Sequence, residues 1–290
     1  MVNLAVVNKS ETFERIKDPL AERNIDIFHI PYEKQTLDIK SPDILPADID
    51  VGYIYPGRIM EGKVIDTLLD VPWVNDQEDV LCSRNKAGVL TQLEQANIDV
   101  PRTVYVSNPI EEAEAIAAFE KLQPPIVIKP NSTTRGIGVT KAHDLDSFLG
   151  IIDYLNLIHD WRATGDRSYL IQEYIRNATD YRVMIIDGKY VGAVKRTFPS
   201  STDSERWKHN VHRGATAVGV ELPNRLRELA IEVAQVLDIS ILGVDLLVSN
   251  DRVVVNETNA RPTIDEQTKY QAGFYDDLAG VIKATTHHSM

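Results

Sequence analysis

The side chains best suited to chemistry in this chain are an aspartate, a glutamate and an asparagine set among apolar residues. Asp245 lies inside the apolar run 242–248, and Glu257 and Asn259 end the run 253–259. Carboxylate and amide oxygens are the ligands that Mg²⁺ takes when it also binds substrate phosphates. The alternative is a solvated hairpin face, but the flanking apolar residues favour burial and therefore a metal site.

A hairpin would bring these residues to one face of a sheet. We expect Val248 to pair with Arg252 across the hairpin loop. Asp245 would then face Val255 and lie diagonally across from Glu257, because side chains alternate along a strand. In that arrangement the two carboxylates can share one cation.

A lysine at the end of an apolar strand precedes a loop of hydroxyl residues and glycines. Lys129 ends the run 126–129, and Gly136 and Gly138 lie in the loop that follows. Backbone N–H groups and hydroxyls of such a loop can bind phosphate oxygens, while the lysine adds a point charge. A glycine-containing hairpin turn without a ligand is an equal alternative.

A further candidate is a glutamate inside the apolar run 169–175. A buried glutamate needs hydrogen-bond donors, so Glu173 requires a partner. An adenine, a ribose or a lysine of the protein would meet that need. Asp180 follows shortly along the chain.

Basic residues gather in two stretches of an otherwise acidic chain. They are Lys195, Arg196, Lys208, His209, His212 and Arg213. The cluster fits an anion-binding cleft better than a nucleic-acid surface, because aromatic residues are not interleaved with the basic ones. Two histidines without a third nearby donor favour hydrogen-bonded or solvated side chains over a metal site.

The composition limits the classes of protein to which this chain can belong. Its 290 residues allow one large domain or two to three small ones, and its formal net charge is −12. An acidic surface repels nucleic acid and anionic membranes, so we expect neither as a partner. The one cysteine, Cys82, excludes an intramolecular disulfide. No apolar run approaches the roughly 20 residues of a membrane span, and a cytoplasmic protein is the default expectation.

The elements that must position these residues form an α/β pattern. We expect strands at 4–7, 25–31, 51–55, 101–106, 126–129, 169–174, 181–186, 190–198, 242–248 and 252–258. We expect helices at 11–23, at 83–95 with Ser83 as its cap, after Asn108-Pro109, from Asp144 and around 226–234. The turn after the first strand lacks glycine and the chain has no GxxxxGK[ST] loop. A nucleotide would therefore have to be bound by another structural element. Three α/β segments, divided near residues 82 and 170, would leave clefts for a ligand.

Taken in order, six motifs resemble the ATP-grasp superfamily, in particular its RimK-like branch of glutamate ligases. The resemblance extends from about residue 51 to the end of the chain. The motifs are Arg84-Asn85-Lys86, Lys129 with the loop Gly136-Ile137-Gly138-Val139, Gln172-Glu173-Tyr174-Ile175, Asn210-Val211-His212-Arg213-Gly214, Gly243-Val244-Asp245 and Glu257-Thr258-Asn259.

The resemblance implies an α/β (α+β) ATP-grasp fold and a set of site residues. The implied domains are an N-terminal pre-ATP-grasp domain 1–82, a central domain 83–170 and a C-terminal domain 171–290, with ATP between the last two. By this resemblance, the phosphates would contact Lys86, Lys129 and the loop of Gly136 and Gly138. Adenine would contact Glu173 and the backbone at Tyr174 and Ile175, and ribose would contact Asp180. Lys208 and Asn210 would lie beside the nucleotide. Asp245, Glu257 and Asn259 would hold two Mg²⁺ ions, which Mn²⁺ could replace, and the arginines Arg213 and Arg196 would face the transferred phosphoryl group.

The activity that the resemblance implies is an ADP-forming carboxylate–amine ligase. ATP would convert a carboxylate to an acyl phosphate, and the amine of glutamate or a similar amino acid would displace phosphate to give an amide. Phosphoryl transfer needs alignment and charge neutralisation, and Arg213 is the candidate for stabilising the oxyanion formed during attack by the amine. The acceptor would be a small molecule, a coenzyme or a protein tail, and relatives often form dimers or tetramers. The alternative, a regulatory nucleotide-binding module without ligation, has no need of three magnesium donors.

One departure from the family pattern follows the metal-binding asparagine. Relatives usually continue with small residues, proline and glycine, whereas this chain has Ala260-Arg261-Pro262. We expect Arg261 to bind a carboxylate of the amine donor or of the acceptor. Arg58 lies in a segment resembling one that lines the acceptor side and is a second candidate, with an arginine in a surface turn as the equal alternative.

Overall fold

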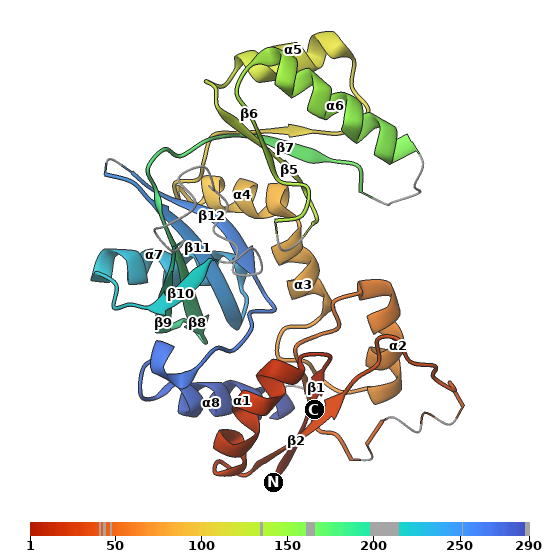
Figure 1. The fold of residues 1–290 in the computed structure, drawn as a ribbon. Coiled ribbons are helices and arrows are strands. Elements are labelled where there is room, and N and C mark those ends of the chain that lie inside the picture. The colour runs from red at the N-terminus through yellow and green to blue at the C-terminus, as the bar shows by residue number, and fades with distance from the viewer. Residues whose placement is uncertain are drawn as a thin grey trace.

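The computed structural model describes residues 1–287 except 41, 43–44, 47, 134–135, 161–165, 198–214 and 251. These residues form three β-sheets with helices packed on their faces, so the expected α/β class is confirmed (Figure 1). In this view the first sheet lies at one end of the molecule, the second at the other end and the third between them. Lys208, Asn210 and Arg213 lie outside the described residues.

The first sheet is parallel and has the strand order β2-β1-β3. Its elements are β1 (Val2–Val7), α1 (Ser10–Ala21), β2 (Ile25–Ile30), β3 (Val51–Tyr53) and α2 (Ile59–Leu69). The last helix of the chain, α8 (Phe274–His287), returns to this sheet, where Phe274, Leu278 and Ile282 share a core with Leu4 and Val6. Distant parts of the sequence therefore build one layer together.

The second sheet is antiparallel and has the order β4-β7-β5-β6. Its strands are β4 (Thr103–Val106), β5 (Ile126–Pro130), β6 (Thr140–Ala142) and β7 (Tyr169–Glu173), and its helices are α5 (Glu112–Glu120) and α6 (Leu145–Asp160). The expected cap of α6 is confirmed, since Asp144 Oδ1 accepts a hydrogen bond of 2.8 Å from Ser147 N. Phe148 and Ile152 of α6 are buried against this sheet.

The third sheet is antiparallel and has the order β10-β9-β8-β11-β12. Its elements are β8 (Thr179–Ile186), β9 (Lys189–Thr197), β10 (Thr216–Gly219), α7 (Asn224–Leu237), β11 (Ile241–Val248), β12 (Val253–Asn259) and the short 3₁₀ helix η2 (Gln267–Lys269). Leu226, Ala230 and Val233 of α7 pack on one face of the sheet. Asp245 of β11 and Glu257 of β12, which pair with each other, lie on the other face.

The helix expected at 83–95 is wrong in one respect, because the chain breaks it at Asn85. The structure has two helices, α3 (Gln77–Arg84) and α4 (Lys86–Gln95), and Asn85 Oδ1 accepts from Gly88 N at 3.0 Å as the cap of α4. Ser83 is buried and is not a cap. Its hydroxyl lies 3.2 Å from Thr258 Oγ1 and accepts from Ala260 N at 3.0 Å, so it joins α3 to the end of β12.

The helices that the structure describes include none with the length and apolar character needed to cross a membrane.

Candidate active site

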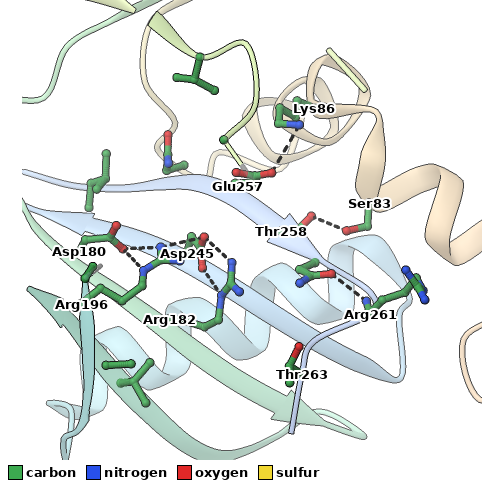
Figure 2. A pocket seen from close by; sticks show the side chains of 18 of the residues that line it. Ser83, Lys86, Asp180, Arg182, Arg196, Asp245, Glu257, Thr258, Arg261 and Thr263 are labelled. Atoms are coloured by element: carbon green, nitrogen blue, oxygen red, sulfur yellow. Dashed lines mark hydrogen bonds and ion pairs between the residues drawn. The ribbon is translucent and has the colours of Figure 1, made fainter. Parts of the chain in front are cut away.

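A cavity of about 1980 Å³ is lined by residues of the second and third sheets, by segments that follow β1, β2 and β3, and by the junction of α3 and α4. It brings together most of the predicted site residues, from segments far apart in the sequence. Those that line it are Arg58, Lys86, Lys129, Gly136, Glu173, Tyr174, Ile175, Asp180, Arg196, Asp245, Glu257, Asn259 and Arg261. Figure 2 shows several of them, with Asp180, Arg196 and Asp245 on one side and Arg261 on the other.

The register of β11 and β12 differs from the one expected. Val248 pairs with Val253, and Asp245 lies directly opposite Glu257. The register shifts between Asp245 and Leu246, which leaves Asn256 as an extra residue on β12. This β-bulge turns Val255 into the core under α7 and Glu257 toward the cavity. The two carboxylates are therefore direct cross-strand neighbours and not diagonal ones.

Asp245 is buried in a network of opposite charges. Its Oδ1 accepts from Arg182 Nε at 2.7 Å, and its Oδ2 accepts from Arg182 Nη2 at 2.7 Å and lies 2.9 Å from Arg196 Nη2. Arg196 also donates to Asp180 Oδ1 from Nε at 3.0 Å and from Nη2 at 2.5 Å (Figure 2). Burial alone would raise the pKa of Asp245, but the charges of Arg182 and Arg196 outweigh it and hold that pKa below its ordinary value.

Arg182 is a site residue that sequence reasoning missed. It occupies the second position after Asp180 on β8, so the two side chains lie on the same face of the strand. That spacing is the signal that could have identified it. The structure places Arg182 opposite Asp245 in the pairing of β8 with β11.

Two lysines face the carboxylates across the cavity. Lys86 Nζ lies 3.4 Å from Glu257 Oε1 and donates to the carbonyl oxygens of Asn131 and Thr133. Lys129 is 4% exposed, and its Nζ approaches Asn256 O at 3.4 Å. Burial lowers the pKa of Lys129 to about 8, with the charge of Glu257 opposing the shift and that of Lys86 adding to it. Lys129 is thus a buried cation that an anionic ligand would stabilise.

The oxygen donors fit a cation that also binds phosphate. Asp245, Glu257 and Asn259 lie on adjacent strands, and Asn259 Oδ1 accepts from Arg261 N at 2.9 Å. No group of three or more histidine, cysteine, aspartate or glutamate side chains among the described residues is arranged to hold a metal by itself. Two carboxylates and one amide instead match Mg²⁺, which usually takes few protein ligands and completes its shell with water and substrate phosphates.

Glu173 has a protein partner, and it is an arginine and not the lysine weighed from the sequence. Glu173 Oε1 accepts from Arg252 Nη1 at 2.5 Å and from Arg102 N at 2.7 Å. Arg252 also donates to both carboxylate oxygens of Asp99. The carboxylate of Glu173 therefore ties the second sheet to the end of the β11–β12 hairpin.

The glycine loop after β5 contributes one glycine to the cavity. Gly136 lines it and Gly138 is not among its lining residues, and contact of both glycines with a ligand stays a prediction. Gly138 has a φ of +77°, and a Cβ there would lie 2.7 Å from Pro130 Cγ. Glycine is needed at position 138 so that the loop can turn back onto Pro130.

The two predicted substrate arginines line the cavity from segments that follow β3 and β12. Arg58 Nη1 lies 3.2 Å from Glu61 Oε2. The guanidinium of Arg261 lies against the backbone of Gly57, where an added Cβ would approach Nη1 to 2.6 Å. The Tyr32 hydroxyl lies beside the Arg58 backbone N–H and in the field of Arg261, and burial raises its pKa.

Comparison with known proteins identifies the family of the chain. The family described as RimK-like ATP-grasp domain matches residues 83–278. A protein of Mannheimia succiniciproducens named probable alpha-L-glutamate ligase is 30% identical over 198 residues, which are 68% of this chain and 62% of that protein. The chain spans less than two thirds of the length of the curated relatives that it matches first.

Solved structures share the fold over the whole chain. A RimK domain ATP-grasp protein from Sphaerobacter thermophilus has a TM-score of 0.70 at 19% identity, covering 98% of this chain and 99% of that chain. The D-alanine–D-alanine ligase of Bacillus anthracis in complex with ATP has a TM-score of 0.68 at 16% identity, covering 99% of this chain and 98% of that chain. The expected ATP-grasp fold is confirmed. Because the family match extends over more than half of its residues, the chain belongs to the RimK-like ATP-grasp family.

Proposed function

We propose that the chain is an ATP-dependent carboxylate–amine ligase that forms an amide bond through an acyl phosphate and releases ADP. The observation that carries the proposal is the opposition of two lysines and two carboxylates in one cavity, with Lys86 Nζ 3.4 Å from Glu257 Oε1. Phosphates bound between them would contact the lysines directly and the carboxylates through Mg²⁺. Relatives named probable alpha-L-glutamate ligase support glutamate or a similar amino acid as the amine donor.

The nucleotide would lie between the second and third sheets. We assign its phosphates to Lys86, Lys129 and the loop at Gly136, its adenine to the backbone at Tyr174 and Ile175, and its ribose to Asp180. The ring of Tyr174, with Lys141 Nζ 4.7 Å from its centre, borders the base site. Both hydrogen bonds from Arg196 go to Oδ1 of Asp180, and a ribose hydroxyl would donate to the same carboxylate beside them.

The metal would be held by Asp245, Glu257 and Asn259. Bound Mg²⁺ would neutralise charge on the phosphates during transfer. Asp245 has to give up part of its contact with Arg182 or Arg196 to act as a ligand. The arginine that is released would then face the phosphoryl group, which supports the catalytic role expected of Arg196. The proposed roles of Arg213 as oxyanion stabiliser and of Lys208 and Asn210 beside the nucleotide concern residues outside the described part of the chain.

The carboxylate substrate and the amine would meet at the end of the cavity where Arg58 and Arg261 lie. We propose that Arg261 binds a carboxylate there, since its guanidinium is packed against Gly57. Arg58 already has Glu61 as a partner and would need to exchange it for a substrate. We further propose a cytoplasmic location and a dimer or tetramer, on the resemblance to RimK-like ligases.

The test is the dependence of ADP release on both substrates. A screen of carboxylate and amine pairs should give ADP and a product of matching mass only when ATP, Mg²⁺, a carboxylate and an amine are all present. A regulatory nucleotide-binding protein would bind ATP but release no ADP with any pair, and that result would overturn the proposal.

A further inference from the structure

Arg84, the last residue of α3, lines the cavity without a partner among the described residues. Its side chain is half-buried, and it makes no ion pair and no hydrogen bond with any of them. Burial lowers the pKa of Arg84, and the Tyr32 hydroxyl gives only a weak opposing interaction. A partly desolvated guanidinium without a counter-charge is unfavourable unless a ligand supplies the anion.

Neighbouring cations differ from Arg84 in this respect. Several have a carboxylate within ion-pair distance in the described part of the chain. These pairs are Arg15 with Glu11 at 2.8 Å, Arg58 with Glu61 at 3.2 Å and Lys269 with Asp265 at 2.8 Å. The protein therefore neutralises these three cations, whereas Arg84 has no acid within ion-pair distance among the described residues.

The packing of Ser83 brings the backbone near Arg84 close to the backbone near Arg261. Ser83 Oγ accepts a hydrogen bond of 3.0 Å from Ala260 N, and Arg84 and Arg261 are the residues that follow these two in the sequence. The side chains of both arginines line the cavity. The two arginines thus add two positive charges to the lining of one cavity, and the guanidinium of Arg261 lies against Gly57.

The same helix junction also positions the reacting end of the cavity. Lys86 is two residues beyond Arg84, and its Nζ points to Glu257 and the proposed phosphate site (Figure 2). Two residues span at most about 7 Å of backbone. The two long side chains add to this span, and because both line the cavity, a substrate with one carboxylate at the phosphates and a second carboxylate at Arg84 would lie within it.

We propose that Arg84 binds a substrate carboxylate that does not take part in the reaction. This inference rests on the proposed ligase function. A guanidinium can donate two parallel hydrogen bonds to a carboxylate, which fixes the orientation of the substrate as well as its charge. The unreacted carboxylate belongs either to an acceptor with two carboxylates or to the amino acid that supplies the amine, and separate ligands distinguish these sources.

The test is calorimetric titration of the full chain with glutarate, a dicarboxylate without an amine, and with L-alanine, an amino acid with one carboxylate. Butyrate, which lacks the second carboxylate, is the reference for glutarate. Arg84→Gln should weaken binding of glutarate or of L-alanine at least tenfold and leave binding of ATP unchanged. A loss of affinity for glutarate alone identifies the acceptor as the source of the unreacted carboxylate. A loss of affinity for L-alanine identifies the amine donor as its source.

Arg225→Gln, on the exposed side of α7, is the matched control and should bind both ligands as the wild type does. Arg84→Lys keeps the charge without the paired donors and should give an intermediate affinity, which keeps the test informative if Arg84→Gln folds poorly. Unchanged binding in Arg84→Gln, or binding of neither ligand by the wild type, would overturn the inference. The proposed ligase function fails on a different result, namely no ADP release from any substrate pair.

Discussion

Glu257 is the residue whose contacts combine most of the proposed chemistry. Its carboxylate lies opposite Asp245 on one side and 3.4 Å from Lys86 on the other. Glu257→Gln keeps the size of the side chain but removes the charge that a divalent cation needs. We expect ADP formation to fall by at least about two orders of magnitude, because metal-assisted charge neutralisation contributes several kcal/mol to catalysis. Measurement of ADP release at saturating Mg²⁺ checks this.

Glu228→Gln is the control for this change, since Glu228 is an exposed residue of α7 far from the cavity in the fold. Both variants should keep the wild-type circular dichroism spectrum. Turnover by Glu257→Gln at the wild-type rate would contradict a metal-binding role of this residue.

Lys129 should make ATP binding depend on pH. Because burial lowers its pKa to about 8, the free protein carries this charge at neutral pH and loses it as the pH rises. Phosphates favour the protonated form, so ATP affinity should fall above pH 8, by at most about tenfold per pH unit. Titration with a non-hydrolysable ATP analogue between about pH 7 and about pH 9.5 measures this slope.

Two substitutions test the origin of the pH dependence. Lys129→Arg keeps a positive charge throughout this range and should show a flatter profile. Lys129→Met should remove the slope and weaken ATP more than adenosine, because the lost contacts are with phosphates. An equal loss of affinity for adenosine would count against the assignment.

Residue types indicated much of the site but not its pairing. Lys129 and Asp245 could be singled out because charged groups inside apolar strands need a partner, and both line the cavity. The sequence does not show which partner meets that need. Asp245 has Arg182 and Glu173 has Arg252, and both pairs join strands whose neighbours are set by the tertiary fold. Whether these residues bind nucleotide and metal stays a prediction.

At the scale of elements, one hydroxyl connects the helix junction to the end of β12. Ser83 Oγ is buried between Thr258 Oγ1 and Ala260 N. Ser83→Ala leaves the Ala260 N–H without its acceptor and should destabilise the fold by about 1–3 kcal/mol. Chemical denaturation measures this, and the same variant should raise the KM of the substrate bound near Arg261 more than the KM of ATP.

Ser240→Ala is the matched control, since Ser240 is exposed before β11. Its effect on the free energy of unfolding should stay within about 0.5 kcal/mol. If Ser83→Ala were equally neutral, the hydroxyl would not be what joins α3 to the β12 end.

Most strands were predictable as elements, whereas their irregularities were not. Apolar runs bounded by turn residues identify β5, β7 and β11 to within a residue or two of their observed ends. The bulge at Asn256 and the break at Asn85 follow no periodic pattern. Each changes the direction of the charged side chain that follows it. The bulge precedes Glu257 and the break precedes Lys86, and both of these side chains line the cavity.

At the scale of the whole molecule, the N-terminal sheet is completed by the last helix. Residues of α8 pack against α1 and β3 and also against β8 of the third sheet. The core that they share contains Leu4 from β1 and Ile186 and Ile241 from β8 and β11. The expected domain boundaries near 82 and 170 stay a prediction, and α3 runs across residue 82. Sequence order alone does not reveal this return of α8, because an amphipathic helix does not specify the sheet on which it packs.

This arrangement predicts that the first and third sheets lose stability together. Leu278 of α8 is fully buried in the shared core, so Leu278→Ala should cost about 2–5 kcal/mol. Hydrogen exchange of backbone amides should accelerate in β1 and β8 alike, while Leu145→Ala, at a partly exposed position of α6, should affect neither. Faster exchange in β1 with β8 unchanged would show that the two sheets open independently. Because Asp180 and Arg182 of the site lie on β8, a common opening would couple the stability of α8 to the integrity of the proposed nucleotide site.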